Sequence, residues 1–105
     1  MALTDQQLQR AAKAVGTPLY AYSAEALRAR VRAVKAALPM AEFVYSLKAN
    51  PNITLVQTLT REGMGVEFCS IFELEACLIA GVSPGEMIFV GPAKSKADIV
   101  RAMQV

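Results

Sequence analysis

Three short apolar runs recur at a fixed spacing, and this periodicity constrains the possible fold more than any other feature. The runs occupy residues 43–47, 64–68 and 87–90, with centres near Val44, Val66 and Ile88, so they repeat every 22 residues. Each run is typical of a strand, and the segments between them carry apolar residues at helical spacing. Because each helix can return the chain so that the next strand runs in the same direction, the repeat predicts a parallel α/β sheet.

Three strand-helix units do not complete a barrel. A (β/α)8 TIM-type barrel takes about 250 residues, whereas this chain has 105 and reaches Val105 inside the helix expected after the third strand. We therefore expect a truncated α/β fold that holds the first three units of such a barrel. Residues 1–22 are interpreted as an N-terminal helix and an extended lead-in, and residues 23–105 as part of the barrel domain.

Capping residues predict where the helices begin and end. Three pairs place an N-cap oxygen three residues before a side chain that can reach back to it: Thr4 with Gln7, Ser70 with Glu73, and Ser95 with Asp98. Gly16, Gly63 and Gly81 follow the last periodic residues of three helices. Asn50 and Pro51 are predicted as an N-cap and a first helical residue, which would end the preceding strand abruptly.

A further helix is predicted before the first strand. Its apolar stripe consists of Leu27, Val31, Val34 and Leu38. Arg28, Arg32 and Lys35 lie on the other side, and we expect them to form a solvated face. Before this helix, residues 17–22 are expected to be extended, because proline is tolerated at the beginning or edge of a strand but not in its middle.

Composition excludes several classes of protein. An apolar fraction of 54% with 19% charged residues excludes a disordered chain, and a net charge of +2 with interleaved signs argues against nucleic-acid binding. There is no signal-peptide pattern, and no apolar run approaches the ~20 residues of a membrane span, so we expect a cytoplasmic location without a membrane partner. Cys69 and Cys77 lack metal-ligand spacing and the chain has no histidine, so we expect reduced packing thiols and no metal site.

Lys48 is the candidate for chemistry, because it comes one residue after the first predicted strand. Parallel α/β sheets gather their reactive groups at this carboxyl end. Side-chain alternation would place Ser46 on the same face as Lys48, so Ser46 is a candidate for the same pocket. Partial desolvation there would favour a neutral amine, which can form a Schiff base with an aldehyde. Position alone leaves an ordinary surface lysine as the alternative.

The octapeptide YSLKANPN at residues 45–52 closely resembles the pyridoxal-phosphate motif of the fold-type III amino-acid decarboxylases, the family of the diaminopimelate, ornithine and arginine enzymes. The resemblance continues in TPLY at 17–20, GMGVEFCS at 63–70, Glu73-Leu74 and GPAKS at 91–95. It implies that Lys48 carries pyridoxal 5'-phosphate and that Glu67, where many members have aspartate, exchanges protons or hydrogen bonds with it. Ser70 and Glu73 are implied as cofactor-binding residues, although a capping box alone also explains them.

The resemblance also implies an active site shared between two subunits of a homodimer, with a second β domain and further cofactor-binding residues beyond Val105. We expect the 105 residues alone to be inactive. Diaminopimelate decarboxylation in lysine biosynthesis is the expected activity, acting on a small amino-acid substrate. The alternatives are an ornithine, lysine, arginine or carrier-bound amino-acid decarboxylase, a non-catalytic regulatory relative, and a free-standing α/β domain. Ile71 and Phe72 replace a pair that is often small in the family, which leaves the substrate open.

Overall fold

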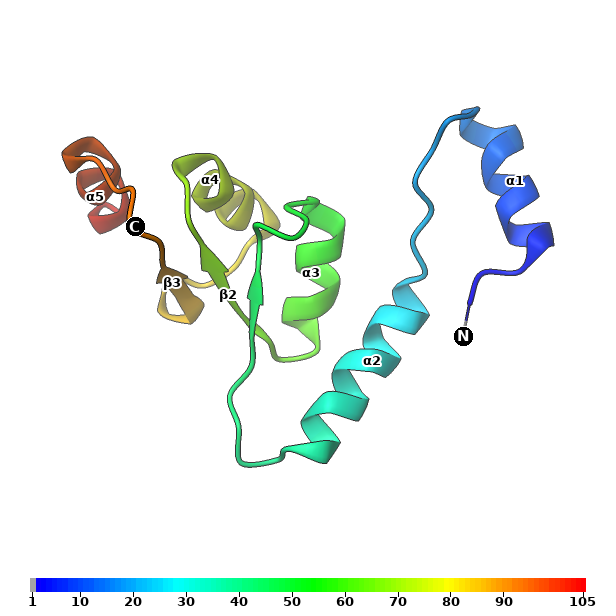
Figure 1. The fold of residues 1–105 in the computed structure, drawn as a ribbon, viewed down its shortest axis with the longest axis horizontal. Helices are drawn as coiled ribbons and strands as arrows, with labels where there is room; N and C mark the ends of the chain where they lie inside the picture. Colours follow the sequence, from blue (N-terminus) through cyan, green and yellow to red (C-terminus); the bar gives the residue numbers. More distant parts are fainter. Residues whose placement is uncertain (1) are drawn as a thin grey trace.

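The computed structural model describes residues 2–105 as helices alternating with short strands (Figure 1). The helices are α1 (Asp5–Val15), α2 (Ala24–Ala37), α3 (Ile53–Arg61), α4 (Ile71–Ala80) and α5 (Lys96–Met103). The strands are β1 (Val44–Ser46), β2 (Gly65–Phe68) and β3 (Met87–Phe89), and a 3-10 turn, η1 (Pro84–Glu86), precedes β3. All three predicted strands are present, each shorter than or equal to its apolar run.

The three strands form one parallel sheet in the order β1-β2-β3. Tyr45 pairs with Val66, and Val66 pairs with Met87. Helices α3 and α4 each return the chain so that the next strand runs in the same direction, as a strand-helix-strand unit requires, and α5 follows β3. The predicted parallel α/β fold, with three units of the barrel type, is therefore confirmed.

Only one face of the sheet carries the hydrophobic core. Val56 from α3 and Cys77 from α4 pack against Leu47 and Val66, and all four side chains are fully buried. On the opposite face, Val44 and Ile88 remain 43% and 50% exposed. Helices on one side and an open face on the other are the arrangement that repeats around a barrel, where the open face becomes the interior.

Helix α1 stands apart from the sheet and its helices, at the far end of an extended connection (Figure 1). The radius of gyration is 16.0 Å, whereas a compact chain of this length would have about 13 Å. Thr4 and Gln7 form the predicted capping box, but no residue of α1 is buried. Of the predicted extended segment 17–22, Thr17 and Pro18 form a bend, whereas residues 19–22 follow an extended path that joins no sheet (Figure 1). None of the helices in the described part is long and apolar enough to span a bilayer.

One expectation for α2 was wrong, and another was incomplete. Leu38 is not part of the buried stripe, because α2 ends at Ala37 and Leu38 is its C-cap with 58% exposure. Arg28 and Arg32 are exposed to solvent as expected, but the cations of this face also form specific contacts. Arg32 binds the Glu62 carboxylate through two 2.8 Å hydrogen bonds, and Lys35 donates to the Glu62 carbonyl oxygen at 2.9 Å. These contacts tie α2 to the carboxyl end of α3, where cations are favoured.

Candidate active site

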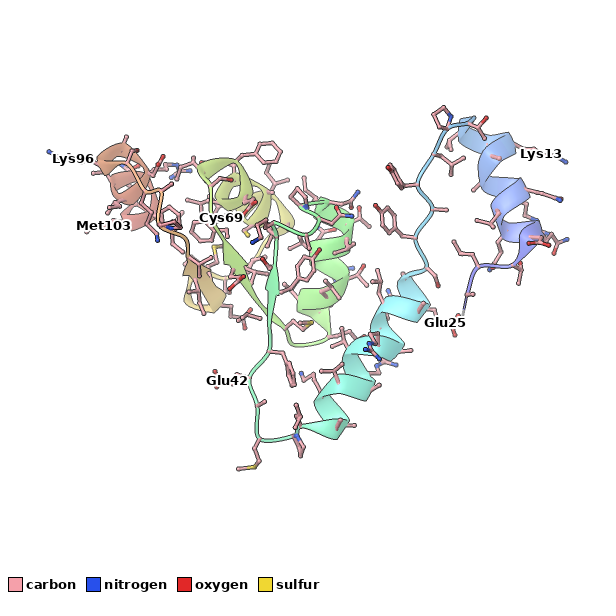
Figure 2. All side chains as sticks on the ribbon, in the orientation of Figure 1. Lys13, Glu25, Glu42, Cys69, Lys96 and Met103 are labelled. Carbon is pink, nitrogen blue, oxygen red and sulfur yellow. The ribbon has the colours of Figure 1, made fainter. Side chains whose placement is uncertain are left out.

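The carboxyl edge of the sheet brings together three segments that each follow a strand. Lys48 follows β1, Cys69 follows β2, and Gly91 follows β3. Figure 2 labels Cys69, which marks the end of β2. Gly91 has a φ of 98° and lies so close to Cys69 that an added Cβ would be 3.5 Å from the Cys69 Cβ atom. This edge is therefore where the sequence predicted a site.

Lys48 lies in a tight turn directly after β1. Leu47 still follows the sheet, since its backbone N–H donates to the Glu67 carbonyl oxygen at 3.0 Å, and its side chain is fully buried. The Ala49 N–H then donates to the Ser46 carbonyl oxygen at 3.1 Å, which closes the turn. Lys48 is therefore held on a rigid edge. Its side chain is exposed, so the predicted partial desolvation is wrong for the surroundings that residues 2–105 provide.

The end of the turn is built differently from the prediction. Helix α3 begins at Ile53, and its N-cap is Asn52, whose side chain accepts from the Leu55 N–H at 3.1 Å. Asn50 and Pro51 precede this cap, so their assignment as N-cap and first helical residue was wrong. Asn50 instead accepts from the Asn52 N–H through its own side-chain oxygen at 3.0 Å. Local side-chain to backbone bonding of this kind is typical of asparagine in turns.

Ser46 and Glu67 lie side by side on the open face of the sheet. They are partners in the parallel register of β1 and β2, and Glu67 is in turn paired with Ile88 of β3. Both polar side chains are half-buried. The strand ends at Ser46 and the chain then turns, so Lys48 lies just beyond the end of the strand. Ser46 and Glu67 thus share one face of the sheet, and Lys48 follows at its carboxyl edge.

Ser70 and Glu73 have structural partners, although not the predicted reciprocal ones. Ser70 Oγ caps α4 by accepting from the Glu73 N–H at 3.2 Å. The Glu73 carboxylate does not reach back to Ser70; it accepts from the Cys69 N–H at 2.8 Å, so the predicted capping box is only half formed. Glu73 is 8% exposed. Its buried carboxylate therefore fixes the segment that leaves β2.

Three charged side chains at this edge influence the pKa of the Cys69 thiol. Partial burial raises the pKa of the Cys69 thiol, and the hydrogen bond and charge of Glu73 raise it further. The positive charge of Lys48 opposes this pKa shift, whereas Glu67 adds to it. Both cysteines are free, and burial raises the pKa of Cys77 to about 11. Cys69 therefore lies within the fields of Lys48, Glu67 and Glu73.

Two features of this edge were missed by the sequence reasoning. Tyr45 and Tyr22 hold Asn50 by hydrogen bonds through their hydroxyl groups, each at 2.9 Å. Cys69 was regarded as a packing thiol, although it sits next to the candidate lysine. Tyr45 and Asn50 belong to the octapeptide that contains Lys48, so their place in this motif could have indicated a role near the lysine. Nothing in the position of Tyr22 in the sequence indicated its hydrogen bond to Asn50.

The residues present fit a cofactor that is held through an amine. Within residues 2–105, Lys48 Nζ has no hydrogen-bond or ion-pair partner. The other lysine just after a strand, Lys94, donates from Nζ to the Gly91 carbonyl oxygen and lies 4.9 Å from the centre of the Phe89 ring. The described residues contain no cluster of acidic, cysteine or histidine side chains that could bind a metal ion. A free amine at the carboxyl edge of a parallel sheet is the kind of group with which the class of pyridoxal-dependent α/β enzymes forms a Schiff base to its cofactor.

Comparison with known proteins places the chain within this class. Residues 24–105 match the family model described as pyridoxal-dependent decarboxylase, pyridoxal binding domain. The chain belongs to this family of pyridoxal-dependent decarboxylases, as its octapeptide and neighbouring segments indicated.

Similar proteins include decarboxylases of several substrates. The chain is 41% identical to a diaminopimelate decarboxylase from Deinococcus radiodurans over its whole length, which covers 28% of that protein. It is 34% identical over 99% of its length to an L-glutamyl-[BtrI acyl-carrier protein] decarboxylase from Niallia circulans, covering 24% of it. A lysine/ornithine decarboxylase from Vibrio vulnificus, complexed with putrescine, superposes with a TM-score of 0.89 at 29% identity, covering 98% of this chain and 29% of that one. The chain thus spans less than a third of these relatives.

Proposed function

We propose that this chain supplies the cofactor-bearing lysine of a pyridoxal-phosphate-dependent amino-acid decarboxylase, with diaminopimelate as the substrate of the whole protein. The observation that carries the proposal is Lys48, an exposed amine with no partner among residues 2–105, on a turn fixed at the carboxyl edge of the sheet. Several curated relatives at 37–41% identity are diaminopimelate decarboxylases, which favours that substrate.

Lys48 has two roles in this proposal. Its Nζ atom would hold the aldehyde group of pyridoxal 5'-phosphate, and as a free amine it would deliver or remove a proton. The bound cofactor would supply an electron sink for the electrons left by departing carbon dioxide. The turn holds the Lys48 backbone at the carboxyl edge of the sheet, which is the part of this positioning that the chain itself provides.

The remaining predicted residues have narrower roles. Glu67 faces the open side of the sheet, from which its carboxylate would exchange a proton with Lys48 Nζ. Ser46, next to Glu67 in the register, provides a hydroxyl for the same pocket. Ser70 and Glu73 keep their predicted contribution to cofactor binding only indirectly, because both already have structural hydrogen bonds. They shape the segment that borders the cofactor.

The whole protein is proposed to be a cytoplasmic homodimer in which residues 23–105 form part of a pyridoxal-phosphate-binding barrel. Residues 1–22 form a separate N-terminal helix and lead-in. Two observations support this division: the family match begins at residue 24, and no residue of α1 is buried. Further barrel units and a second β domain would complete the active site, so the 105 residues alone are expected to release no carbon dioxide.

A carrier-bound amino acid is the second candidate substrate. The similarity to the acyl-carrier-protein decarboxylase from Niallia circulans extends over 99% of the chain, so the described segment does not by itself discriminate between the two substrates. Ornithine, lysine and arginine are further alternatives, since the same lysine chemistry serves all of them.

The test is carbon dioxide release by the protein expressed from the complete reading frame that contains these residues. We expect release from diaminopimelate that exceeds release from ornithine, lysine, arginine and carrier-bound glutamate. Lys48→Ala should abolish it, whereas Lys94→Ala, which removes the other lysine at the same edge, should leave most activity. Activity retained in Lys48→Ala would refute the assigned role, and preference for another amino acid would refute the substrate.

A further inference from the structure

Three polar side chains form a continuous hydrogen-bonded chain around the turn that carries Lys48. Tyr45 Oη donates to the Asn50 carbonyl oxygen at 2.9 Å. Asn50 Nδ2 donates to Tyr22 Oη at 2.9 Å, and Asn50 Oδ1 accepts from the Asn52 N–H at 3.0 Å. Asn50 therefore uses its carbonyl group and both ends of its side-chain amide. This leaves the residue that ends the turn little freedom to move.

Tyr45 anchors this hydrogen-bonded chain to the core. Its ring packs against both buried clusters of the protein, one around Leu47 and Val56 and the other around Val31 and Leu55. Burial raises the pKa of Tyr45, as does the neighbouring Tyr22, against the opposing effect of the Asn50 hydrogen bond. The hydroxyl group thus remains protonated and able to donate at neutral pH. A donor fixed in the core holds the Asn50 carbonyl group in place.

Tyr22 connects the turn to a different part of the chain. It belongs to the extended segment before α2 and directly precedes Ser23, the N-cap of that helix. The Tyr22 side chain is half exposed, yet its hydroxyl accepts from Asn50 across 28 residues of sequence. Three segments are thereby joined at one point: the lead-in to α2, strand β1 and the turn.

The position of Lys48 depends on the backbone of its turn, because no contact of its own side chain fixes it within residues 2–105. Its side chain is exposed and its amine lacks a hydrogen-bond partner, so the place of Nζ is set by the backbone on either side. On one side, Leu47 is fully buried. On the other side, the backbone is fixed at Asn50 by its three hydrogen bonds. Loss of either tyrosine hydroxyl removes one of these bonds and leaves the Lys48 amine unchanged.

We propose that Tyr45, Asn50 and Tyr22 are positioning residues that hold the Lys48 turn in the geometry needed for cofactor attachment and proton transfer. This inference rests on the proposed function of Lys48. It adds that the extended segment before α2 takes part in the active site through Tyr22. None of the three residues hydrogen-bonds to Lys48, so they act through the backbone of the turn.

The test compares Tyr45→Phe and Tyr22→Phe with Tyr20→Phe in the protein from the complete reading frame. Each variant loses one hydroxyl group and keeps the ring, and Tyr20 is a matched control because it is 91% exposed and has no hydrogen bond in the described structure. We expect the rate of pyridoxal-phosphate attachment to the cofactor-free protein, and kcat, to fall about 3- to 10-fold in the first two variants, the range that one hydrogen bond supports. KM and the control should be nearly unchanged.

A destabilised variant separates positioning from general loss of structure. Val82→Ala removes two methyl groups from the same core at the opposite edge of the sheet, where Val82 leads toward β3. It should lower the unfolding temperature at least as much as Tyr45→Phe while leaving the attachment rate and kcat nearly unchanged. Equal slowing by Val82→Ala, or rates for Tyr45→Phe and Tyr22→Phe equal to those of Tyr20→Phe, would overturn the inference.

The proposed function fails in a different way. If the unmodified protein does not attach pyridoxal phosphate to Lys48, the function itself is wrong, whatever the tyrosine variants do. If attachment occurs at Lys48 but is indifferent to both hydroxyl groups, only the positioning role is wrong. Asn50→Ala provides a further check, since it removes both the donor to Tyr22 and the oxygen that accepts from the Asn52 N–H; it should slow attachment at least as much as Tyr22→Phe.

Discussion

Arg32 and Glu62 form a two-point ion pair between α2 and the carboxyl end of α3. Nε and Nη2 of Arg32 each lie 2.8 Å from a different carboxylate oxygen. Arg28 adds a weaker contact at 3.9 Å, and Lys35 binds the backbone of the same segment. The planar guanidinium matches a carboxylate at two points, which fixes orientation as well as distance. Glu62 thus adds a polar attachment to the apolar packing of Val31 of α2 against Leu55 and Leu59 of α3.

This ion pair predicts a loss of stability at acid pH. Hydrogen bonding to Arg32 lowers the pKa of Glu62 below its ordinary value of 4.5. Its contribution is therefore fully present above that ordinary value and is lost as pH falls through the lower value of the folded state. Glu62→Gln should flatten this acid limb in urea unfolding measured across pH. Glu42→Gln, at an exposed carboxylate without an ion pair in the described structure, should retain it; identical pH profiles for all three proteins would contradict the prediction.

Leu47 and Leu38 should differ sharply in their contribution to stability, although both looked like core residues in the sequence. Leu47→Ala removes a fully buried side chain from the main cluster and should lower the free energy of unfolding by about 2–5 kcal/mol. Leu38→Ala, at a side chain 58% exposed, should change it by no more than about 0.5 kcal/mol. Chemical denaturation measures both values. Similar losses for the two variants would place Leu38 in the core, against the structure.

The sequence was most informative where a periodic pattern and a local signal agreed. The strand runs predicted β1, β2 and β3, and Ser95 with Asp98 predicted the capping box of α5, which the structure contains. Lys48 was placed correctly at the end of β1 because only local chain direction was needed.

Details that depend on tertiary contacts were not predictable in this way. Glu73 has the spacing of a capping box. Its carboxylate nevertheless accepts from the backbone N–H of Cys69, in the segment that leaves β2, and not from that of Ser70. Asn50 lies directly before a proline, as an N-cap residue often does, but the N-cap of α3 is Asn52. The bond between Tyr22 and Asn50 spans 28 residues, a separation about which neither periodicity nor capping carries information.

Cys69 provides a test of the electrostatics at the candidate site that does not depend on activity. Because the Glu73 charge raises the pKa of the thiol and Lys48 lowers it, Glu73→Gln should increase the thiolate fraction and Lys48→Met should decrease it. Alkylation by iodoacetamide at a fixed, mildly alkaline pH should therefore be faster in the first variant and slower in the second. A Cys77→Ala background removes the other thiol. Rate changes in the same direction for both variants would mean that the charges do not act as described.

Ser70 should behave as a helix cap and not as a cofactor ligand. Ser70→Ala removes the acceptor for the Glu73 N–H and should cost about 1 kcal/mol of stability. Ser95→Ala, which removes the corresponding cap of α5, is the matched control and should cost a similar amount. Cofactor titration of the full protein should give the same affinity for both variants. A selective loss of affinity in Ser70→Ala would instead assign Ser70 to cofactor binding.

Chemical trapping tests most directly whether Lys48 carries the cofactor. Pyridoxal phosphate is added to the protein from the complete reading frame, the linkage is reduced with borohydride, and the modified peptide is identified by mass spectrometry. We expect one modified lysine, Lys48, on the peptide that contains YSLKANPN. An unmodified Lys48, or modification that falls on Lys94 or other exposed lysines instead, would contradict it.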